Sequence, residues 1–230
     1  MLQIYKILGV NCLVTALTLS TLSIEGVKQG DSQMTSMGLV VAGLFFMISL
    51  ARPLSTLSPS RPPTSVLCIS ALLSISLQFT VHLVFIFLTV SLSQPYIDPY
   101  STATVPDAPF SPTPLNSAVF LVGSCVTINT FSVNYVGRPF TESMRENKLF
   151  FRSLIFCWFM LAVAATEVFL PLNQMLQLEA FPVPGNLGDI VRGEGGIKEL
   201  ALESGGLTGA VVGIMIADTV FVHAVGGLFN

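Results

Sequence analysis

The residues most able to do chemistry in this sequence are polar side chains inside long apolar runs. Gln78 and His82 stand four positions apart in one run, so a single helix face would present both. Asn129, Asn134 and Asp218 stand in two later runs. In lipid such groups must face protein or water, which makes these five residues candidates for a functional site. The competing interpretation, hydrogen bonding that holds helices together, is the more common role for amides.

The polar residues in these runs differ in how strongly they suggest a site. Asp218 is near the middle of its run, where an unpaired carboxylate is costly, and is a stronger candidate than Glu167. Glu167 is expected near the end of its run, where hydration removes most of that cost. Asn11 stands in the first run. His82 and His223 are single histidines, and a single intramembrane histidine is more often a hydrogen-bonded packing residue than a metal ligand.

The composition is that of a membrane protein. Apolar residues make up 52% of the 230 residues and charged residues only 10%, whereas soluble domains are about a quarter charged. The net charge of -3 and the lack of a basic patch give no support to nucleic-acid binding. Each of the four cysteines lies in an apolar run without the paired spacing of a disulfide framework or a zinc site: Cys12, Cys68, Cys125 and Cys157.

Six apolar runs are each close to the ~20 residues that cross a bilayer. They predict an all-α, polytopic fold, a single transmembrane domain over residues 1–230, with spans at about 3–24, 34–50, 66–93, 115–136, 149–172 and 207–229. The connectors 94–114 and 173–206 are rich in Pro, Ser, Thr or Gly and are predicted to be flexible loops, with a possible short helix at 196–203. Glycines at every fourth position predict a close helix contact at the start of the last span: Gly205, Gly209 and Gly213.

The polar connector 134–148 orients these spans. Short loops rich in Lys and Arg stay in the cytosol, so this connector is predicted to be cytosolic. The cytosolic loops then hold most of the basic residues: Arg52, Arg61, Arg138, Arg145, Lys148 and Arg152. The opposite side holds three basic residues and nine acidic ones: Lys28, Arg192, Lys198, Glu25, Asp31, Asp98, Asp107, Glu179, Asp189, Glu194, Glu199 and Glu203.

Catalytic motifs are missing from the sequence. The glycines around Gly193 lack the Gly-Lys-Ser/Thr of a phosphate-binding loop. There is no HExxH pair, nucleophile elbow or EF-hand loop. We therefore expect no enzymatic activity from this chain alone, and no cofactor or metal bound by it.

Several stretches together resemble one protein family. They read YKILGVNCLVTALTLSTLSIEGVKQGD, LFFMISLARPLSTLSPSRP, LQFTVHL and LNSAVFLV…FSVNYVGRPFTESMRENKLFFRSL. In order and spacing they resemble the C-terminal membrane region of the type-five P-type ATPases, in particular the A branch of the endoplasmic reticulum. The most specific piece follows the pattern NY.G.PF.ES..ENK, which comprises Asn134, Tyr135, Gly137, Pro139, Phe140, Glu142, Ser143, Glu146, Asn147 and Lys148.

The resemblance implies that the six spans correspond to helices five to ten of a P-type pump. Such pumps bind ATP and magnesium and phosphorylate an aspartate in a DKTGT motif, which this sequence lacks together with the cytosolic catalytic domains. The chain is therefore expected to be a C-terminal fragment, a truncated gene product or a separately encoded piece, inactive alone. The A branch removes misplaced transmembrane helices from the endoplasmic reticulum membrane, and older descriptions call the family cation-transporting ATPases.

By the same resemblance, the first two spans would line a substrate cavity and the other four would support it. Asn11 would reach this cavity, and Glu25 and Asp31 would form an acidic lumenal mouth that attracts basic substrate termini. The partners implied are the lipid bilayer, the missing part of the pump, and a transmembrane helix or a cation. Two alternatives remain: a self-standing six-helix channel or carrier with Gln78, Asn129 and Asp218 along its pathway, and a structural membrane subunit.

Overall fold

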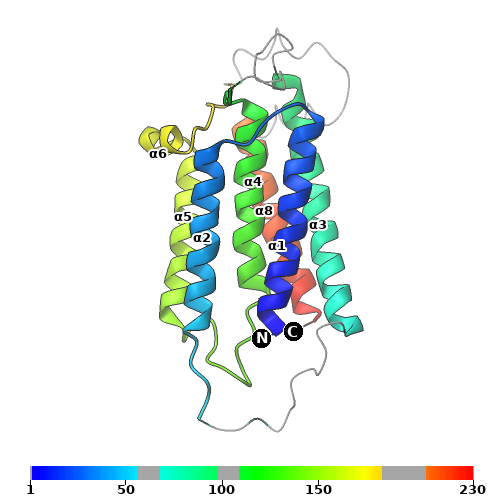
Figure 1. Ribbon diagram of the computed structural model, residues 1–230, viewed down its shortest axis with the longest axis vertical. Helices are drawn as coiled ribbons and strands as arrows, with labels where there is room; N and C mark the ends of the chain where they lie inside the picture. Colours follow the sequence, from blue (N-terminus) through cyan, green and yellow to red (C-terminus); the bar gives the residue numbers. More distant parts are fainter. Residues whose placement is uncertain (1, 56–57, 59–67, 98–108, 183–205, 230) are drawn as a thin grey trace.

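The chain folds into a bundle of long helices (Figure 1). The computed structural model describes residues 2–55, 58, 68–97, 109–182 and 206–229. The described elements are α1 (Leu2–Ile24), α2 (Asp31–Ser49), α3 (Ile69–Ser93), the 3-10 turn η1 (Gln94–Tyr96), α4 (Pro114–Val133), α5 (Lys148–Ala165), α6 (Leu170–Met175) and α8 (Gly206–Gly227). Six of these helices are long and apolar enough to cross a membrane, which confirms the predicted all-α membrane fold.

Helix α4 is the centre of the bundle. In its most apolar 18-residue window 94% of the residues are buried, whereas the corresponding value for α2 is 17%. Helices α1, α3, α5 and α8 all pack against α4, and α2 packs mainly against α5. This central helix carries more buried polar side chains than any other described helix, because its neighbours can satisfy them: Asn116, Ser117, Ser124, Thr127, Asn129 and Thr130.

Local sequence explains where several helices begin. The Thr113 hydroxyl accepts a hydrogen bond from the Asn116 amide at 3.1 Å, and Pro114 follows at the first helical position of α4. The Asn147 side chain accepts from the Phe150 amide at 3.2 Å and caps α5.

Two helices end earlier than the apolar runs suggest. Helix α4 ends at Val133, so Asn134 is the residue that follows the helix. Helix α5 ends at Ala165, and the predicted continuation to Leu172 is wrong. Glu167 adopts a positive φ of 55° there, and the short helix α6 follows beside the end of α5, turned away from the direction of that helix (Figure 1). Glu167 therefore lies outside the long helices, and its carboxylate accepts a hydrogen bond from the Phe181 amide at 2.8 Å.

The ends of the bundle carry different connectors. Both chain termini lie at one end, where α2 and α4 finish and α5 begins (Figure 1). This end holds the described basic residues Arg52, Arg138, Arg145, Lys148 and Arg152. The α1–α2 turn and α6 lie at the other end. Some residues of the predicted charge pattern fall outside the described residues, as does the possible helix at 196–203: Arg61, Asp98, Asp107, Asp189, Arg192, Glu194, Lys198, Glu199 and Glu203.

Candidate functional site

A buried polar cluster joins α3, α4 and α8. His82 Nδ1 lies 2.7 Å from one carboxylate oxygen of Asp218, and the Asn129 amide donates to the other at 2.9 Å. The same amide nitrogen lies 3.0 Å from the Thr219 hydroxyl. His82, Asn129 and Asp218 are each fully buried. Three helices thus share one carboxylate, and a charge in an apolar bundle is tolerated only through such partners.

A pair of amides forms a second layer of the cluster. Gln78 and Asn134 exchange two hydrogen bonds, Gln78 Nε2 to Asn134 Oδ1 at 3.2 Å and Asn134 Nδ2 to Gln78 Oε1 at 2.7 Å. Gln78 Nε2 also donates to the Ser74 hydroxyl at 3.0 Å. Because Gln78 and His82 are one turn apart on α3, the two layers lie on the same buried face of that helix.

Gln78, His82, Asn129, Asn134 and Asp218 therefore form two hydrogen-bonded groups along one buried face of α3, whereas Asn11 and Glu167 lie elsewhere. Sequence reasoning missed Ser74 and Thr219, whose hydroxyls complete the hydrogen bonds. A signal existed for Ser74, which is four residues before Gln78 on the same helix face. Nothing in the sequence distinguishes Thr219 from the other hydroxyl residues of the apolar runs.

Two polar atoms in the cluster have no hydrogen-bond partner. They are His82 Nε2 and Asn129 Oδ1, both buried. Among the described residues there is no group of three His, Cys, Asp or Glu side chains that could hold a metal ion. The contacts that are present hold helices together.

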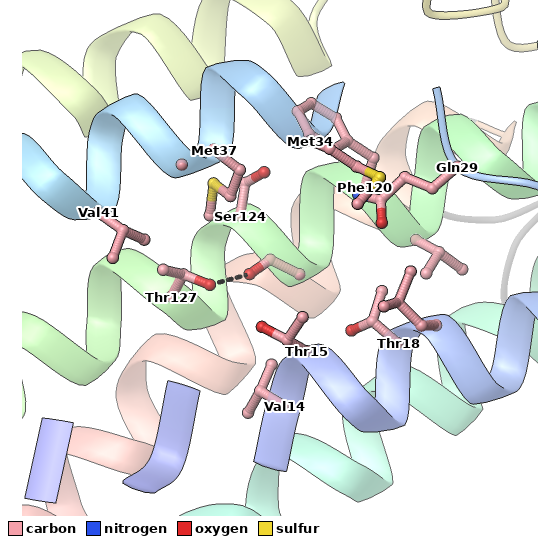
Figure 2. Close-up of a pocket in the computed structure, with 14 residues that line it drawn as sticks. Val14, Thr15, Thr18, Gln29, Met34, Met37, Val41, Phe120, Ser124 and Thr127 are labelled. Atoms are coloured by element: carbon pink, nitrogen blue, oxygen red, sulfur yellow. Dashed lines mark hydrogen bonds between the residues drawn. The ribbon is translucent and has the colours of Figure 1, made fainter. Parts of the chain in front are cut away.

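A groove of about 250 Å³ lies on the other side of α4, between α1 and α2 (Figure 2). Its polar lining consists of hydroxyls and one amide: Thr15, Thr18, Gln29, Ser124 and Thr127. Thr127 donates to the Gly123 carbonyl at 2.9 Å, whereas the Ser124 hydroxyl is buried without a partner. A second hollow of about 460 Å³ adjoins it and shares Leu19, Gln29 and Met34.

The three residues predicted for a substrate cavity lie around these hollows. Asn11 is 7% exposed, lies one turn before Thr15 on α1, and does not line either hollow. Both polar atoms of its side-chain amide are buried without a hydrogen-bond partner. Glu25 precedes Gly26 of the second hollow and accepts a hydrogen bond from Gln94 at 3.1 Å. Asp31 is exposed in the first turn of α2.

The connector between α4 and α5 is a tight, internally bonded loop. The Tyr135 hydroxyl donates to the Glu142 carbonyl at 3.0 Å, and the Tyr135 ring stacks on Phe150 with ring centres 5.0 Å apart. A side chain on Gly137 would meet the Glu142 carbonyl oxygen at 2.8 Å, which explains the glycine. The bond between Arg138 and Pro139 is cis.

This loop also binds the end of α2. The Glu142 amide donates to the Arg52 carbonyl at 3.0 Å, and the Glu142 side chain accepts from the Arg52 amide at 3.1 Å. The Leu54 amide donates to the Phe140 carbonyl at 3.3 Å. Asn147, the cap of α5, donates to the Met47 carbonyl at 3.3 Å. The two connectors therefore form one unit at this end of the bundle.

Glu146 stabilises the exposed part of the loop. One carboxylate oxygen accepts from the Ser143 amide at 2.8 Å, and the other accepts from the Arg138 guanidinium. The Ser143 hydrogen bonds, and then the Arg138 guanidinium, lower the pKa of Glu146 to about 2. Lys148 follows as the first residue of α5.

Sequence comparisons identify relatives of this chain. The chain is 43% identical over 188 residues to the probable manganese-transporting ATPase PDR2 of Arabidopsis thaliana, which covers 82% of this chain and 16% of that protein. It is 36% identical over 178 residues to the endoplasmic reticulum transmembrane helix translocase of Schizosaccharomyces pombe, covering 77% of this chain and 15% of that protein. The translocase of that name in Saccharomyces cerevisiae is 34% identical over 177 residues, covering 76% and 14%. No family model matches the chain.

The chain is homologous to the type-five P-type ATPases. It spans about a seventh of the length of these ATPases. With its six apolar helices, it corresponds to a membrane region of such a pump. Three residues of the connector pattern, Tyr135, Glu142 and Asn147, bond the loop to itself and to the end of α2 and the segment after it.

Proposed function

We propose that this chain is the membrane part of an ATP-driven type-five pump of the endoplasmic reticulum, and that the groove between α1 and α2 receives part of the transported substrate. ATP and magnesium would act on other parts of the full-length pump. The observation that carries the proposal is the groove itself, a hollow lined by hydroxyl residues between two helices that are long and apolar enough to cross a membrane.

The packing of the two helices supports this role. Helix α1 packs mainly against α3 and α4, and α2 packs mainly against α5 and α4. The space between α1 and α2 is floored by α4 through Phe120, Ser124 and Thr127 (Figure 2). In lipid, an exposed hydroxyl residue such as Thr15 gains from any polar group that a substrate brings. The cluster of α3, α4 and α8 on the other side of α4 would keep this floor in place.

The lining favours a helix over a metal ion as the substrate in this groove. None of the residues that line it carries a carboxylate, whereas hard divalent cations such as Mn²⁺ prefer carboxylate oxygens. Met34, Met37 and Val41 provide an apolar wall with small neighbours at Gly38 and Gly123. Such a wall fits an apolar helix that carries occasional polar residues.

The acidic residues at one end suggest how the substrate is captured. Glu25 is half-buried and Asp31 is exposed, both at the end of the bundle where the second hollow opens. We propose that they attract basic residues flanking a substrate helix. The basic residues at the opposite end favour a cytosolic position for that end, which makes the acidic end lumenal.

The decisive experiment is site-specific photo-cross-linking in the full-length pump. A photoreactive residue at Val41 of α2 is placed in the groove, and one at Val84 of α3, which is 54% exposed, serves as the control. Microsomes receive a newly made membrane protein with a misplaced, basic-flanked helix. We expect a cross-link from position 41 that disappears on ATP addition, and none above background from position 84.

The acidic mouth is tested separately with the variant Glu25→Gln/Asp31→Asn. Capture of basic-flanked helices should weaken, while capture of helices with neutral flanks stays the same. Equal cross-linking from positions 41 and 84 would refute the proposal that the groove receives the substrate. Unchanged capture in the neutralised variant would refute only the role of the mouth.

A further inference from the structure

A third hollow, distinct from the groove and from the hollow beside it, has an almost entirely apolar lining. It has a volume of about 210 Å³ and lies between α2, α4, α5 and α6. Its lining includes Val40, Ile128, Met160, Leu161, Ala164 and Leu172. Ser36 and Ser124 are the two hydroxyl residues among those that line it.

The chemistry of this cavity selects an apolar occupant. Apolar protein cavities of about 150 Å³ stay free of water and bind small hydrocarbons. A larger cavity with a hydrocarbon wall and two hydroxyls gives a water molecule few partners, because a buried water needs two to four polar contacts. An empty cavity of this size would cost the dispersion contacts of its lining.

The cavity is accessible from outside the bundle. Leu161, Ala164 and Leu172 in its wall are buried, whereas Phe156 and Met175 are 61% exposed. Both α2 and α5 are long and apolar enough to cross the membrane. The opening therefore lies between two helices that are apolar enough to cross a membrane.

Helix α6 places the cavity at one leaflet. It lies across the end of α5 (Figure 1) and buries Leu172 and Asn173, with the Asn173 amide donating to the Ala164 carbonyl at 3.1 Å. Val168, Phe169 and Leu170 beside it are 78%, 53% and 58% exposed. Such a short helix, with an apolar face turned outward at the end of a membrane bundle, is suited to the boundary between headgroups and acyl chains.

We propose that the cavity between α2, α5 and α6 holds a phospholipid acyl chain from the leaflet at the α6 end. The chain enters beside Met175, passes between α2 and α5, and ends near Ile128 of α4. Bound there, it fills the space that α2 leaves open and fixes α2 against α5. This site is separate from the groove, although Met37, Phe120 and Ser124 line both.

The test uses a phosphatidylcholine with a photoreactive group in the middle of one acyl chain. The full-length protein is reconstituted in vesicles containing this lipid, extracted into detergent, washed, and only then irradiated. We expect adducts on the peptides that contain Val40 and Met160, because a chain held in a cavity survives the wash. The α8 surface around Val220, which is 61% exposed, should carry no adduct.

Two variants fill the cavity and one serves as the control. Ala164→Phe and Val40→Trp should each remove most of the adduct, and Val220→Phe on the α8 surface should leave it unchanged. Val40 is half-buried, so Val40→Trp remains informative if Ala164→Phe fails to fold. The proposal would be overturned if washing removed all adducts from the unaltered protein. It would also be overturned if Ala164→Phe and Val40→Trp folded and still carried the adducts. Adducts spread equally over α5 and α8 would also overturn it, since they indicate ordinary contact with bulk lipid.

Discussion

The two sides of α4 are built differently. On one side, α3 and α8 are joined to α4 by buried side-chain hydrogen bonds around Asp218 and between Gln78 and Asn134. On the other side, α2 meets α4 and α5 across two hollows, and its hydrogen bonds to other elements lie at its ends. At one end Gln33 donates to Asn116 at 2.7 Å, and at the other Asn147 donates to the Met47 carbonyl.

This difference suggests how a membrane bundle can be both stable and able to accept a substrate. Lipid provides little apolar driving force between helices, so close packing and polar contacts decide which helices stay together. The side with α3, α4 and α8 has both. Helix α2 is attached to other elements by hydrogen bonds at its two ends, so its middle can move away from α1 or α5.

The largest effect is expected from removing the shared carboxylate. Asp218→Ala leaves His82 Nδ1 and the Asn129 amide without their acceptor in a buried site. Leaving a buried polar group without its partner costs about 1–3 kcal/mol, and two groups lose an acceptor here, so we expect a clear fall in the unfolding temperature in detergent. Ile216→Ala on the exposed face of α8 is the control and should change stability little. An unfolding temperature within the range of that control would show that the cluster does not hold α8.

A smaller effect is expected where α4 and α8 approach most closely. A side chain on Gly226 would collide with the Val133 side chain, whereas one on Gly227 would meet nothing within 4 Å. Gly226→Ala should therefore destabilise the protein by about 1–3 kcal/mol through overpacking, measured by thermal unfolding. Gly227→Ala is the matched control and should be neutral or slightly stabilising, because alanine favours a helix. Equal effects of the two substitutions would contradict this account of the α4–α8 contact.

The amide pair should give a still smaller, measurable coupling. We expect Gln78→Leu and Asn134→Leu to be non-additive by about 1 kcal/mol in a double-mutant cycle, since each single change strands the partner amide. The corresponding cycle between Gln78 and Gln33, which lie on opposite sides of α4, should be additive. Additivity in the first cycle would mean that the two hydrogen bonds contribute nothing to the association of α3 with α4.

The smallest effect is expected in the loop that connects α4 to α5. The pKa of Glu146 is lowered from 4.5 to about 2, so its contacts with Ser143 and Arg138 are fully present above pH 4.5 and are lost as the pH falls through 2. A carbon-13 titration of the labelled carboxyl group should show a midpoint near 2. Arg138→Gln should move that midpoint upward, towards the ordinary value. A midpoint near 4.5 in the unaltered protein would mean that the loop is open in solution.

The sequence by itself determined the class of fold and the residues that matter most in the bundle. Runs of about 20 apolar residues have few other structures open to them, because lipid leaves no partner for an unbonded backbone. Polar side chains in such runs need hydrogen-bond partners for the same reason, and other polar side chains in the bundle can provide them. Gln78, His82, Asn129, Asn134 and Asp218 could therefore be named from the sequence as one set. The connector pattern likewise pointed to the type-five ATPases, and the sequence relatives agree.

Only the tertiary structure decided which of these residues meet and where the helices stop. The regular glycines predicted a close approach at the start of the last span, where Gly205 lies outside the described residues. A side chain on Gly213 would meet nothing within 4 Å, whereas one on Gly226 would collide with Val133. Apolarity continues past Ala165, but α5 ends there because the chain turns at Glu167, where φ is positive, before the short helix α6. The groove and the acyl-sized cavity have no sequence signal of their own. They arise from the spacing of α2 from its neighbours, which depends on contacts between residues far apart in the chain.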